Sequence, residues 1–559
     1  MAVPGPDVLQ PAVLSRPILI LLALLALGIL FSPEISDSDF WWHLKTGEYI
    51  AGTHSLPYPD PFAFTTPTSS AEALVRRLNL THEWLAQLLL YTAYRALGFP
   101  AVILLRVLLL LAFCIIPAFV VYRRGLGIDR AIAGGAAVAL AVHPLIADRP
   151  YLLTFVFVAA FLAVLDSPPT KLQWTLPAIM LVWANAHGGF VLGLAILAVW
   201  LGAALLERKP VRRLLLVSGR TFAAAALNPN GFQVFAVLAA YRRGFLTSTL
   251  AEWQPIALWP PNRYVLLIVC AAAVMLYARR RLRLTDLLIF ILFSLLTLLA
   301  GRNAFLIACI APILIATYAP IPSRHASATA VATSALAVAA LAIAVALGGR
   351  YLPQLRVAEW AHPVGPARFL REHAITGRMF NTYEYGGYLI WALWPQQRVF
   401  IDGRALSESV FADYGRILHY ADNATGKSAR ELLDQYGIDV ILMNTFEYTS
   451  GVAYALPPAL AEAEDPTWQL VYADATAVIF MRKPPPGIRP IARDQVFTSM
   501  ESECALHIAH QPEYSGCARA LGLMYASVGE PASARRWLSL YLQHHIGSDP
   551  EAERALLAQ

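Results

Sequence analysis

Residues 16–44 read RPILILLALLALGILFSPEISDSDFWWHL, and this stretch decides the class of fold. Its first part, 16–33, is an apolar run close to the roughly 20 residues that a helix needs to cross a membrane. The run is too long for a signal peptide and lacks a small-residue cleavage site, so we interpret it as a retained first helix. Two carboxylates, three aromatic rings and a histidine follow it directly.

The apolar character continues far beyond this stretch. The chain has 559 residues, of which 57% are hydrophobic and 14% charged, whereas soluble proteins have about 25% charged residues. Further membrane spans are predicted at 100–122, 130–147, 150–166, 172–186, 188–206, 212–228, 262–278, 284–300, 303–319 and 327–347. We therefore predict a polytopic α-helical membrane protein with about eleven spans.

Basic residues in short loops predict the orientation. They cluster at Arg123–Arg124, Lys209–Arg213 and Arg279–Arg283, and such loops favour the cytoplasm. This topology takes 83–98 as an amphipathic helix that lies in the interface without spanning it. The net charge of +6 then reflects topology, and we expect no nucleic-acid partner.

The opposite ends of the predicted helices carry the unusual polar side chains. They are Asp37, Asp39, His43, Glu83, Asp148, Arg149, His187, Asn228, Asn230, Glu252 and Arg302. Ionisable groups at membrane depth are unfavourable unless they face a cavity or a partner. The positive-inside rule uses only the basic residues of the loops, and it places all of these polar residues on the opposite face. The sequence therefore predicts a polar substrate cavity on the outer side of the membrane.

Each candidate has a structural alternative. Trp41 and Trp42 either anchor the loop in the membrane interface or also line the cavity. Asp37 and Asp39 are either solvated loop charges, or a general base and ligands of a divalent metal. A similar choice holds for the cationic and helix-end residues. Arg149 and Arg302 either snorkel or hold a phosphate, while His187 and Glu83 either complete helix ends or line the cavity.

The C-terminal half reads as soluble. Residues 351–484 alternate helical and strand patterns, with short strands expected at 378–383, 398–403, 439–444, 468–474 and 477–482, which predicts an α/β domain. Gly386 and Gly387 suggest a tight turn after the first strand. Glu384 and Tyr385, with Asp402 and Arg404, are expected to line a surface facing the membrane, or else to form a structural turn and an ion pair.

The last segment, 485–559, is predicted to be helical. Its pattern Leu-Gly-x-x-Tyr at 521–525, followed by Ala534 and Trp537, is typical of one tetratricopeptide-like hairpin, which either caps the α/β domain or docks a protein partner. Cys504 and Cys517 either pair or stay free. The predicted organisation is a transmembrane domain (1–350, with 34–98 as the first outer loop), the α/β domain (351–484) and this tail.

Several motifs carry a resemblance to a known class. They are D-x-D-x-W-W-H-L at Asp37 to Leu44, H-E-W-L at His82 to Leu85, R-P-x-x-x-T at Arg149 to Thr154, N-x-H-G-G at Asn185 to Gly189, N-P-x-G at Asn228 to Gly231 and G-G-Y-x-x-W…D-G-R at Gly386 to Arg404. Their layout resembles GT-C class membrane glycosyltransferases. Asp37 to Phe40 is also similar to the first-loop motif of oligosaccharyltransferase catalytic subunits. Thr382 to Gly386 is similar to their Trp-Trp-Asp-Tyr-Gly motif, although Glu384 replaces the aspartate and the tryptophan pair is missing.

The resemblance implies a transferase of the bacterial inner membrane with an extracytoplasmic C-terminal domain. It implies a polyprenyl-phosphate-type sugar donor, an acceptor glycan, lipid or protein, and a catalytic aspartate at Asp37 with Asp39 beside it, with Mg or Mn as a candidate cofactor. Arg149 and Arg302 would bind the donor phosphate. The alternatives are a non-catalytic scaffold of an envelope glycosylation system, or a transporter, for which the internal repeats are lacking.

Overall fold

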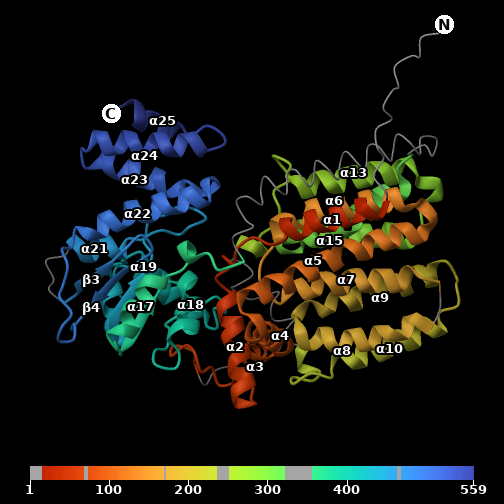
Figure 1. Ribbon diagram of the computed structural model, residues 1–559, viewed down its shortest axis with the longest axis horizontal. Coiled ribbons are helices and arrows are strands. Elements are labelled where there is room, and N and C mark those ends of the chain that lie inside the picture. Colours follow the sequence, from red (N-terminus) through yellow and green to blue (C-terminus); the bar gives the residue numbers. More distant parts are fainter. Residues whose placement is uncertain are drawn as a thin grey trace, which may run out of the picture. The chain divides into compact units, whose positions relative to one another are not determined.

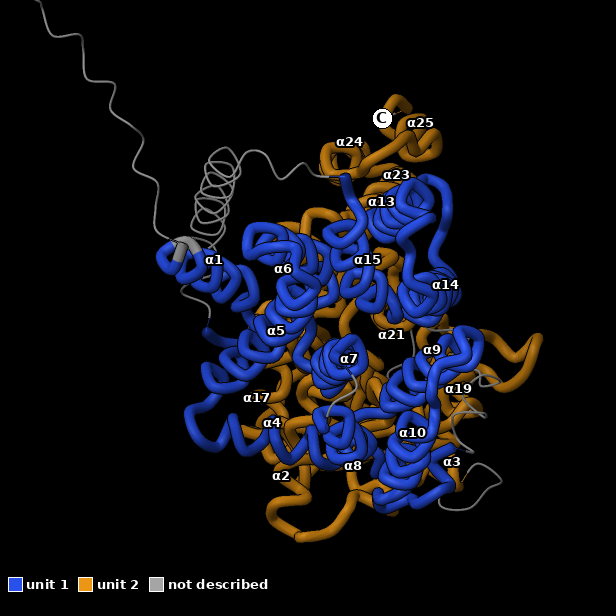
Figure 2. The backbone as a smooth tube through the Cα atoms, turned by 90° about the vertical axis from the view of Figure 1, so that its right-hand side faces the viewer, with its two compact units in different colours: residues 1–35, 81–357 blue, residues 36–80, 358–559 orange. Residues whose placement is uncertain are grey.

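The computed structural model describes residues 16–67, 73–168, 171–235, 251–320, 355–462 and 467–558. The chain divides into two compact units, each built from two stretches of sequence (Figure 2). Unit 1 comprises Met1–Ile35 and Thr81–Val357, and unit 2 comprises Ser36–Leu80 and Ala358–Gln559. The first outer loop is thus divided between the units, and the part that carries Asp37 and Asp39 belongs with the C-terminal residues.

Unit 1 consists of helices that run side by side as long rods (Figure 1). They are α1 (Arg16–Leu30), α4 (Trp84–Leu97), α5 (Phe99–Val121), α6 (Ile128–Val142), α7 (Tyr151–Asp166), α8 (Leu176–Ala186), α9 (Val191–Leu206), α10 (Arg212–Ala225), α13 (Arg263–Tyr277), α14 (Leu284–Leu299) and α15 (Ala304–Tyr318). Close packing at two glycines brings neighbouring rods together. A Cβ on Gly135 would stand 3.1 Å from the Ala118 Cβ, and one on Gly193 would stand 2.7 Å from the Trp183 ring.

The predicted spans from 16–33 to 303–319 each coincide with one of these helices, whereas 327–347 lies outside the described residues. Within the described part of the chain, four helical stretches are long and apolar enough to cross a membrane: Phe99–Leu126, Ile128–Leu145, Gly188–Leu206 and Gly301–Tyr318. Four more apolar helices are shorter. The structure therefore supports a helical membrane protein, and the number of eleven spans stays a prediction. The segment expected to lie in the interface is α4.

Unit 2 is built around a four-stranded sheet in the order β1-β2-β4-β3. The strands are β1 (Arg378–Asn381), β2 (Ile438–Met443), β3 (Gln469–Ala473) and β4 (Val478–Met481). β1 and β2 are parallel, and β4 pairs antiparallel with both β2 and β3. Successive residues of a strand point to opposite faces, so Ile441 joins one buried cluster and Leu442 joins another.

Helices cover both faces of this sheet. The helices of unit 2 are α2 (Phe40–Thr53), α3 (Ala73–Thr81), α17 (Val364–Glu372), α18 (Tyr383–Leu393), α19 (Glu408–Leu418), α20 (Ala429–Gln435), α21 (Leu456–Glu462), α22 (Gln495–His510), α23 (Gly516–Ser527), α24 (Pro531–His544) and α25 (Pro550–Leu557). Trp42 and Phe62 of the first loop belong to the cluster with Leu442. The polar and aromatic loop expected after α1 is therefore largely the helix α2, packed into the C-terminal domain.

The helical tail shares its core with the sheet. Leu521, Trp537 and Tyr541 belong to the same buried cluster as Ile441, which supports the capping alternative. α23 and α24 form a helical hairpin in which Gly522 lies against Leu538, since an added Cβ would stand 2.6 Å from the Leu538 Cγ. Membership of the tetratricopeptide class stays a prediction.

Two local predictions in unit 2 are wrong. Residues 398–403 do not form a strand. Val399 makes only an isolated bridge to Ala63, and the residues after it bond to the side chain of Asn381. Its Nδ2 donates to the Ile401 oxygen at 2.8 Å and its Oδ1 accepts from the Phe400 N–H at 2.8 Å. Gly386 and Gly387 do not form a turn but lie inside α18, where their missing side chains admit neighbouring backbone.

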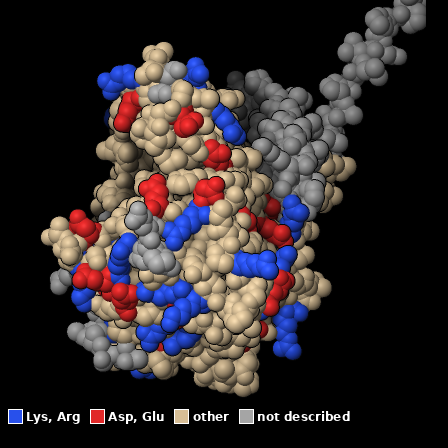
Figure 3. Space-filling model, turned by 90° about the vertical axis from the view of Figure 1, so that its left-hand side faces the viewer, with Lys and Arg blue, Asp and Glu red and all other residues tan. Residues whose placement is uncertain are grey.

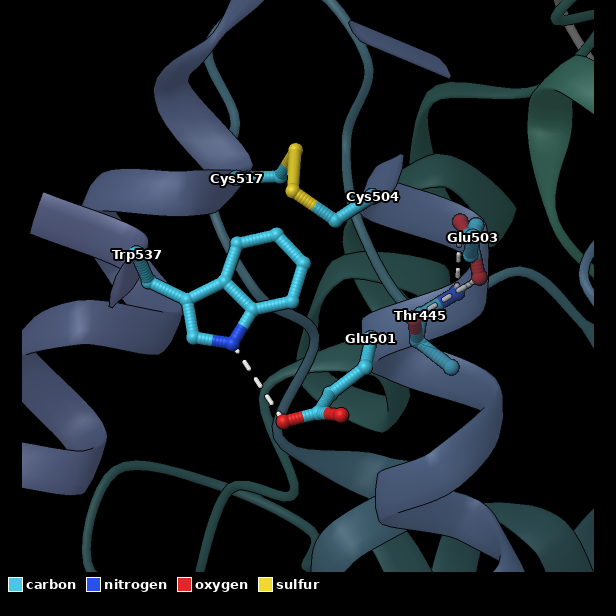
Figure 4. Close-up of a disulfide and its surroundings, with 6 residues drawn as sticks. All are labelled: Thr445, Glu501, Glu503, Cys504, Cys517 and Trp537. Atoms are coloured by element: carbon cyan, nitrogen blue, oxygen red, sulfur yellow. Dashed lines mark hydrogen bonds between the residues drawn. A yellow bond between two sulfur atoms is a disulfide. The ribbon is translucent and has the colours of Figure 1, made fainter. Parts of the chain in front are cut away.

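The two cysteines of the tail are paired. Cys504 on α22 and Cys517 on α23 form a disulfide with their Cα atoms 5.7 Å apart (Figure 4). On the same helix as Cys504, Glu503 accepts hydrogen bonds from the Thr445 N–H at 2.9 Å and from its hydroxyl at 2.7 Å. Glu501 accepts from the Trp537 indole at 3.3 Å. The disulfide joins α22 to α23. The hydrogen bonds join α22 to the residues just after β2 and to α24.

Candidate functional site

Two arginines of unit 1 meet on a single glutamate. Arg302, between α14 and α15, donates from Nη1 to the Glu252 Oε1 at 3.2 Å, and Arg149, just before α7, has its Nη1 3.9 Å from the Glu252 Oε2. Their side chains are 30% and 32% exposed. The Arg302 guanidinium also lies 4.1 Å from the centre of the Trp253 ring. We call Arg149, Glu252 and Arg302 the outer cluster. Two positive charges there share one carboxylate.

A second polar group of unit 1 is centred on His187. Its Nε2 lies 3.5 Å from the Glu83 Oε1, which is also 3.2 Å from the His82 Nε2. Its Nδ1 accepts from the Gly189 N–H at 3.0 Å and lies 2.8 Å from the Thr154 hydroxyl. The structure brings Glu83 and His187 into contact, and it brings Arg149 and Arg302 onto Glu252, although these residues come from distant loops. Their role in a substrate cavity stays a prediction.

The hydrogen bonds assign the protonation state of His187. Thr154 accepts from the Trp183 indole N–H at 2.8 Å, so its own hydroxyl proton points to the His187 Nδ1. Because Nδ1 accepts, the ring proton stands on Nε2 and faces Glu83. His187 lies between two predicted spans. Burial lowers its pKa to about 4, the Glu83 carboxylate opposes this shift, and Arg302 and His82 add to it. The ring is therefore neutral at pH 7.

The asparagines predicted at the outer helix ends serve as structural ties. Asn185 accepts from the Trp84 indole at 2.9 Å and donates to the Leu227 oxygen at 2.9 Å. Asn228 accepts from the Asn230 N–H at 2.8 Å, and Asn230 pairs with the Thr81 hydroxyl. These bonds satisfy backbone groups where helices end and hold α4 against α8 and α10.

One ionisable residue of this region was missed from the sequence. Arg106, in the middle of the apolar run of α5, is buried and donates from Nη1 to Asp148 at 2.6 Å. Its Nε donates to the Phe31 oxygen at 3.1 Å, and its Nη2 donates to the Pro33 oxygen. Arg106, held by Asp148, thereby fixes the chain that leaves α1. A lone arginine within an apolar run was the signal that could have revealed it.

Asp37 and Asp39 lie in unit 2, at the start of α2. Asp37 Oδ1 accepts from the Asp39 N–H at 3.0 Å, which makes a local turn, and both residues are partly exposed. The Asp39 carboxylate lies against Gly403, since a Cβ there would stand 1.7 Å from the Asp39 Oδ1. Whether these aspartates share a face with the polar residues of unit 1 stays a prediction.

The neighbouring aromatics are buried, so the expectation of interfacial anchors is wrong. Trp41 is 2% exposed, and its indole donates to the His362 Nε2 at 3.1 Å. Trp42 is 7% exposed, and His43, with its ring 3.5 Å away, is 3% exposed. A lipid anchor needs contact with the bilayer, and these side chains instead fill the interior of unit 2.

Glu384, Tyr385, Asp402 and Arg404 also form internal contacts. Arg404 bonds to Asp402 at 2.6 Å and to Asp60 at 3.0 Å, and all three are buried. This favours the ion-pair alternative and adds Asp60, which the sequence did not reveal. Tyr385 is fully buried, with its hydroxyl 2.6 Å from that of Tyr448.

Glu384 is the most perturbed acid of this group. Its Oε1 accepts from the Tyr454 hydroxyl at 3.0 Å, whereas its buried Oε2 has no hydrogen-bond partner among the described residues. Burial raises the pKa of Glu384 to about 7, against the effect of its hydrogen bonds. It is therefore partly protonated at neutral pH.

The described residues contain no group of three or more His, Cys, Asp and Glu side chains placed to hold a metal. Asp37 and Asp39 offer two carboxylates, which suits only a divalent ion such as Mg²⁺ or Mn²⁺ that keeps several waters and takes further oxygens from a phosphate substrate. On the face of the molecule drawn in Figure 3, Lys and Arg side chains are interspersed with Asp and Glu.

Comparison with known proteins gives one informative result. No protein-family model and no curated protein sequence matches the chain. Among solved structures, the oligosaccharyltransferase of Archaeoglobus fulgidus in its apo form matches with a TM-score of 0.52 and 12% identity, over 87% of this chain and 77% of that chain. ArnT from Cupriavidus metallidurans, bound to undecaprenyl phosphate, matches at 14% identity with a TM-score of 0.46, over 84% and 98%. The first match confirms the resemblance in fold to GT-C glycosyltransferases.

Proposed function

We propose that this protein is a membrane glycosyltransferase that moves a sugar from a polyprenyl-phosphate-type lipid donor to an acceptor on the outer face of a bacterial inner membrane. The observation that carries the proposal is the outer cluster, in which Arg149 and Arg302 both reach the carboxylate of Glu252 and are partly open to solvent. The fold resemblance to an oligosaccharyltransferase is in accord with it.

The outer cluster supplies what a donor phosphate needs. A guanidinium binds phosphate oxygens through two parallel hydrogen bonds. The two arginines are about one-third exposed, and both reach the carboxylate of Glu252. Positive charge at this point stabilises the phosphate that leaves the sugar, and fixed charge near a leaving group lowers the barrier most. A phosphate that reaches the cluster replaces Glu252 as the partner of Arg302.

Asp37 is the proposed general base. The acceptor hydroxyl attacks the anomeric carbon of the donor sugar, and its proton passes to the Asp37 carboxylate. The bond between the anomeric carbon and the phosphate oxygen breaks, and its electron pair leaves with the polyprenyl phosphate. Asp37 Oδ1 is oriented by the Asp39 N–H, and Asp39 shapes the acceptor site beside it. Glu83, with the neutral His187, lines the polar floor on the donor side.

A divalent cation, Mg or Mn, belongs to the proposal as an optional cofactor. Asp37 and Asp39 would hold it, together with waters and substrate oxygens. It would supply positive charge next to the phosphate. Titration of metal-free protein with MnCl₂, followed by the Mn²⁺ electron paramagnetic resonance signal, tests such binding apart from activity.

The orientation is proposed with unit 2 outside the cytoplasm. The disulfide between Cys504 and Cys517 suits an oxidising compartment such as the periplasm. The acceptor would be a glycan, a lipid or a protein, and the helical tail, beyond its capping role, would offer a surface for a protein partner.

Transfer from a radiolabelled polyprenyl-phosphate sugar by the purified full-length protein in nanodiscs tests the function. We expect Asp37→Asn to abolish transfer while the protein stays folded. Asp422→Asn is a matched control, because Asp422 also accepts from the N–H two residues later, that of Ala424 at 3.0 Å, but lies on an exposed loop. Full activity of Asp37→Asn would refute its role. Wild-type protein that transfers no sugar from any such donor would favour the scaffold alternative.

A further inference from the structure

The segment that carries the two aspartates lies directly on glycines of the C-terminal half of unit 2. A Cβ added to Gly403 would stand 1.7 Å from the Asp39 Oδ1, and one added to Gly387 would stand 2.4 Å from the Ser38 oxygen. Real Cβ atoms do not approach other atoms so closely, so only glycine permits the present position of the segment at either place. The sequence distances are 364 and 349 residues, so nothing local in the sequence reveals these contacts.

Gly403 is itself held firmly. Its oxygen accepts from the Tyr383 hydroxyl at 2.9 Å. Its neighbours Asp402 and Arg404 are buried and joined to each other at 2.6 Å, and Arg404 continues to Asp60. Asp402 also packs on Gly386, where an added Cβ would stand 2.6 Å from the Asp402 Cα. The turn at 402–404 is therefore a rigid surface, and Asp39 is the part of this contact that can move.

The helix that follows Asp39 is fixed on α18, so the segment cannot withdraw from this surface. The Trp41 ring packs edge-on against Tyr388 with centroids 4.8 Å apart. The Lys45 ammonium lies 5.4 Å from the Trp391 ring centre and 5.3 Å from that of Trp394. Contacts with α18 thus continue along α2 beyond Ser38.

We propose that Gly403 and Gly387 are positioning residues of the transferase, because they form the seat on which the Asp37–Asp39 segment is held. Gly403 sets the place of the Asp39 carboxylate, and Gly387 sets the place of the backbone that carries Asp37 and Asp39. The seat is a direct contact between D-x-D-x-W-W-H-L and G-G-Y-x-x-W…D-G-R. Its importance for catalysis rests on the proposed function, whereas its geometry does not.

Alanine substitutions separate the two glycines. The Cβ that Gly403→Ala adds would meet the end of the flexible Asp39 side chain. The protein should therefore fold normally while the Asp39 carboxylate moves. We expect the kcat for transfer to fall by about a hundredfold, the loss that a misplacement of about 1 Å can produce, with a much smaller change in the KM for the donor. Gly387→Ala meets the Ser38 backbone, so amide hydrogen exchange of residues 36–44 should rise about tenfold.

Gly415→Ala is the matched control, because Gly415 lies in α19 of the same unit and an added Cβ meets no atom within 4 Å. It should change neither kcat nor exchange. A double-mutant cycle combines Gly403→Ala with Asp39→Ala, which removes the carboxylate that the new Cβ displaces. In the Asp39→Ala background, Gly403→Ala should have no further effect on transfer or on melting temperature. An equal loss from Gly403→Ala in both backgrounds would overturn the seat.

A measurement that does not depend on transferase activity tests this inference separately from the proposed function. The labelling rate of Asp39→Cys by a soluble maleimide, followed by mass spectrometry, should rise at least about fivefold when Gly403→Ala is added, because the displaced side chain moves off the seat. An unchanged rate would refute the seat even in an active enzyme. A rise in the labelling rate together with an inactive wild-type protein would uphold the seat and refute the transferase.

Discussion

Two charged clusters lie at opposite ends of the same helices of unit 1, and they are built differently. The outer cluster stands before α7 and between α14 and α15. The other, here called the inner cluster, consists of Arg124, Asp166, Arg283 and Asp286, at the end of α7 and the start of α14. Arg124 bonds to Asp166 at 2.8 Å and to Asp286 at 2.9 Å. Arg283 bonds to Asp166 at 2.7 Å.

The difference lies in the burial of the carboxylates. In the inner cluster the Asp286 side chain is 1% exposed and that of Asp166 is 8% exposed. Asp286 also accepts from the Tyr318 hydroxyl at 2.7 Å. In the outer cluster the Glu252 side chain is 43% exposed and lies 3.2 Å from Arg302 and 3.9 Å from Arg149. A network around buried carboxylates stabilises the fold, whereas one around an exposed carboxylate is open to a ligand.

The largest expected effect is on the inner cluster. Arg124→Ala leaves Asp166 and Asp286 without their shared partner in a buried site, which should lower the free energy of unfolding by about 3–5 kcal/mol. Thermal unfolding of the full chain in detergent measures it. Arg280→Ala, a change in the exposed basic turn at Arg279–Arg281, is the control. A loss below about 1 kcal/mol would show that the inner cluster does not stabilise the fold.

Arg302→Ala should have the opposite profile. The outer pair is exposed, so the free energy of unfolding should change by less than about 1 kcal/mol. Loss of a charged hydrogen-bonding partner should weaken binding of a polyprenyl phosphate by about 1.5–3 kcal/mol, which is at least tenfold. Calorimetric titration in nanodiscs measures this affinity. A variant that unfolds like Arg124→Ala and binds the lipid normally would reverse the comparison.

The next effect concerns pH. The pKa of His187 is near 4 in the fold and about 6.5 in the unfolded chain, so the unfolded state binds more protons between these values. The stability that neutral His187 contributes is complete above pH 6.5 and is lost as the pH falls towards 4. We expect a loss of about 3 kcal/mol across this window, at about 1.4 kcal/mol for each pKa unit, absent in His187→Asn. His373→Asn, at an exposed histidine, should keep the wild-type slope.

The smallest effect should come from salt. Raising the NaCl concentration from 50 mM to 500 mM screens exposed charges more than buried ones. The small difference in melting temperature between wild type and Arg302→Ala should therefore vanish at high salt, while that of Arg124→Ala should persist. Equal responses of both variants would show that the two clusters have similar access to solvent.

The helices of unit 1 were predictable because the lipid bilayer imposes one requirement on every span. A segment within it must be apolar and must satisfy its own backbone groups, so composition alone reveals the spans. Four of the five predicted strands of unit 2 were also found, from their β-branched and aromatic residues. The prediction for residues 398–403 was wrong, because their backbone bonds to the Asn381 side chain and, through one isolated bridge, to Ala63, and not along a strand.

The site was predictable only in part. Loop charges predicted one common face for Arg149, Glu252 and Arg302, because local composition reflects topology, and the structure brings these three side chains together. The helix α2 was missed, because the stretch FWWHLKTGEY has no simple apolar period and depends on packing against α18. Asp60 was missed because its partner, Arg404, lies 344 residues away, and a carboxylate in a loop gives no sign of a distant ion pair.

The division of unit 2 has a consequence for biosynthesis. Residues 36–80 are made early, and their partners from Ala358 onward follow after the helices of unit 1. At about 5–20 residues per second, the aspartate segment waits on the order of tens of seconds before its seat exists. Because α23 and α24 share the core of the sheet, the wait lasts until these helices are made as well. A chain truncated after the helices of unit 1 lacks the residues on which the aspartate segment packs.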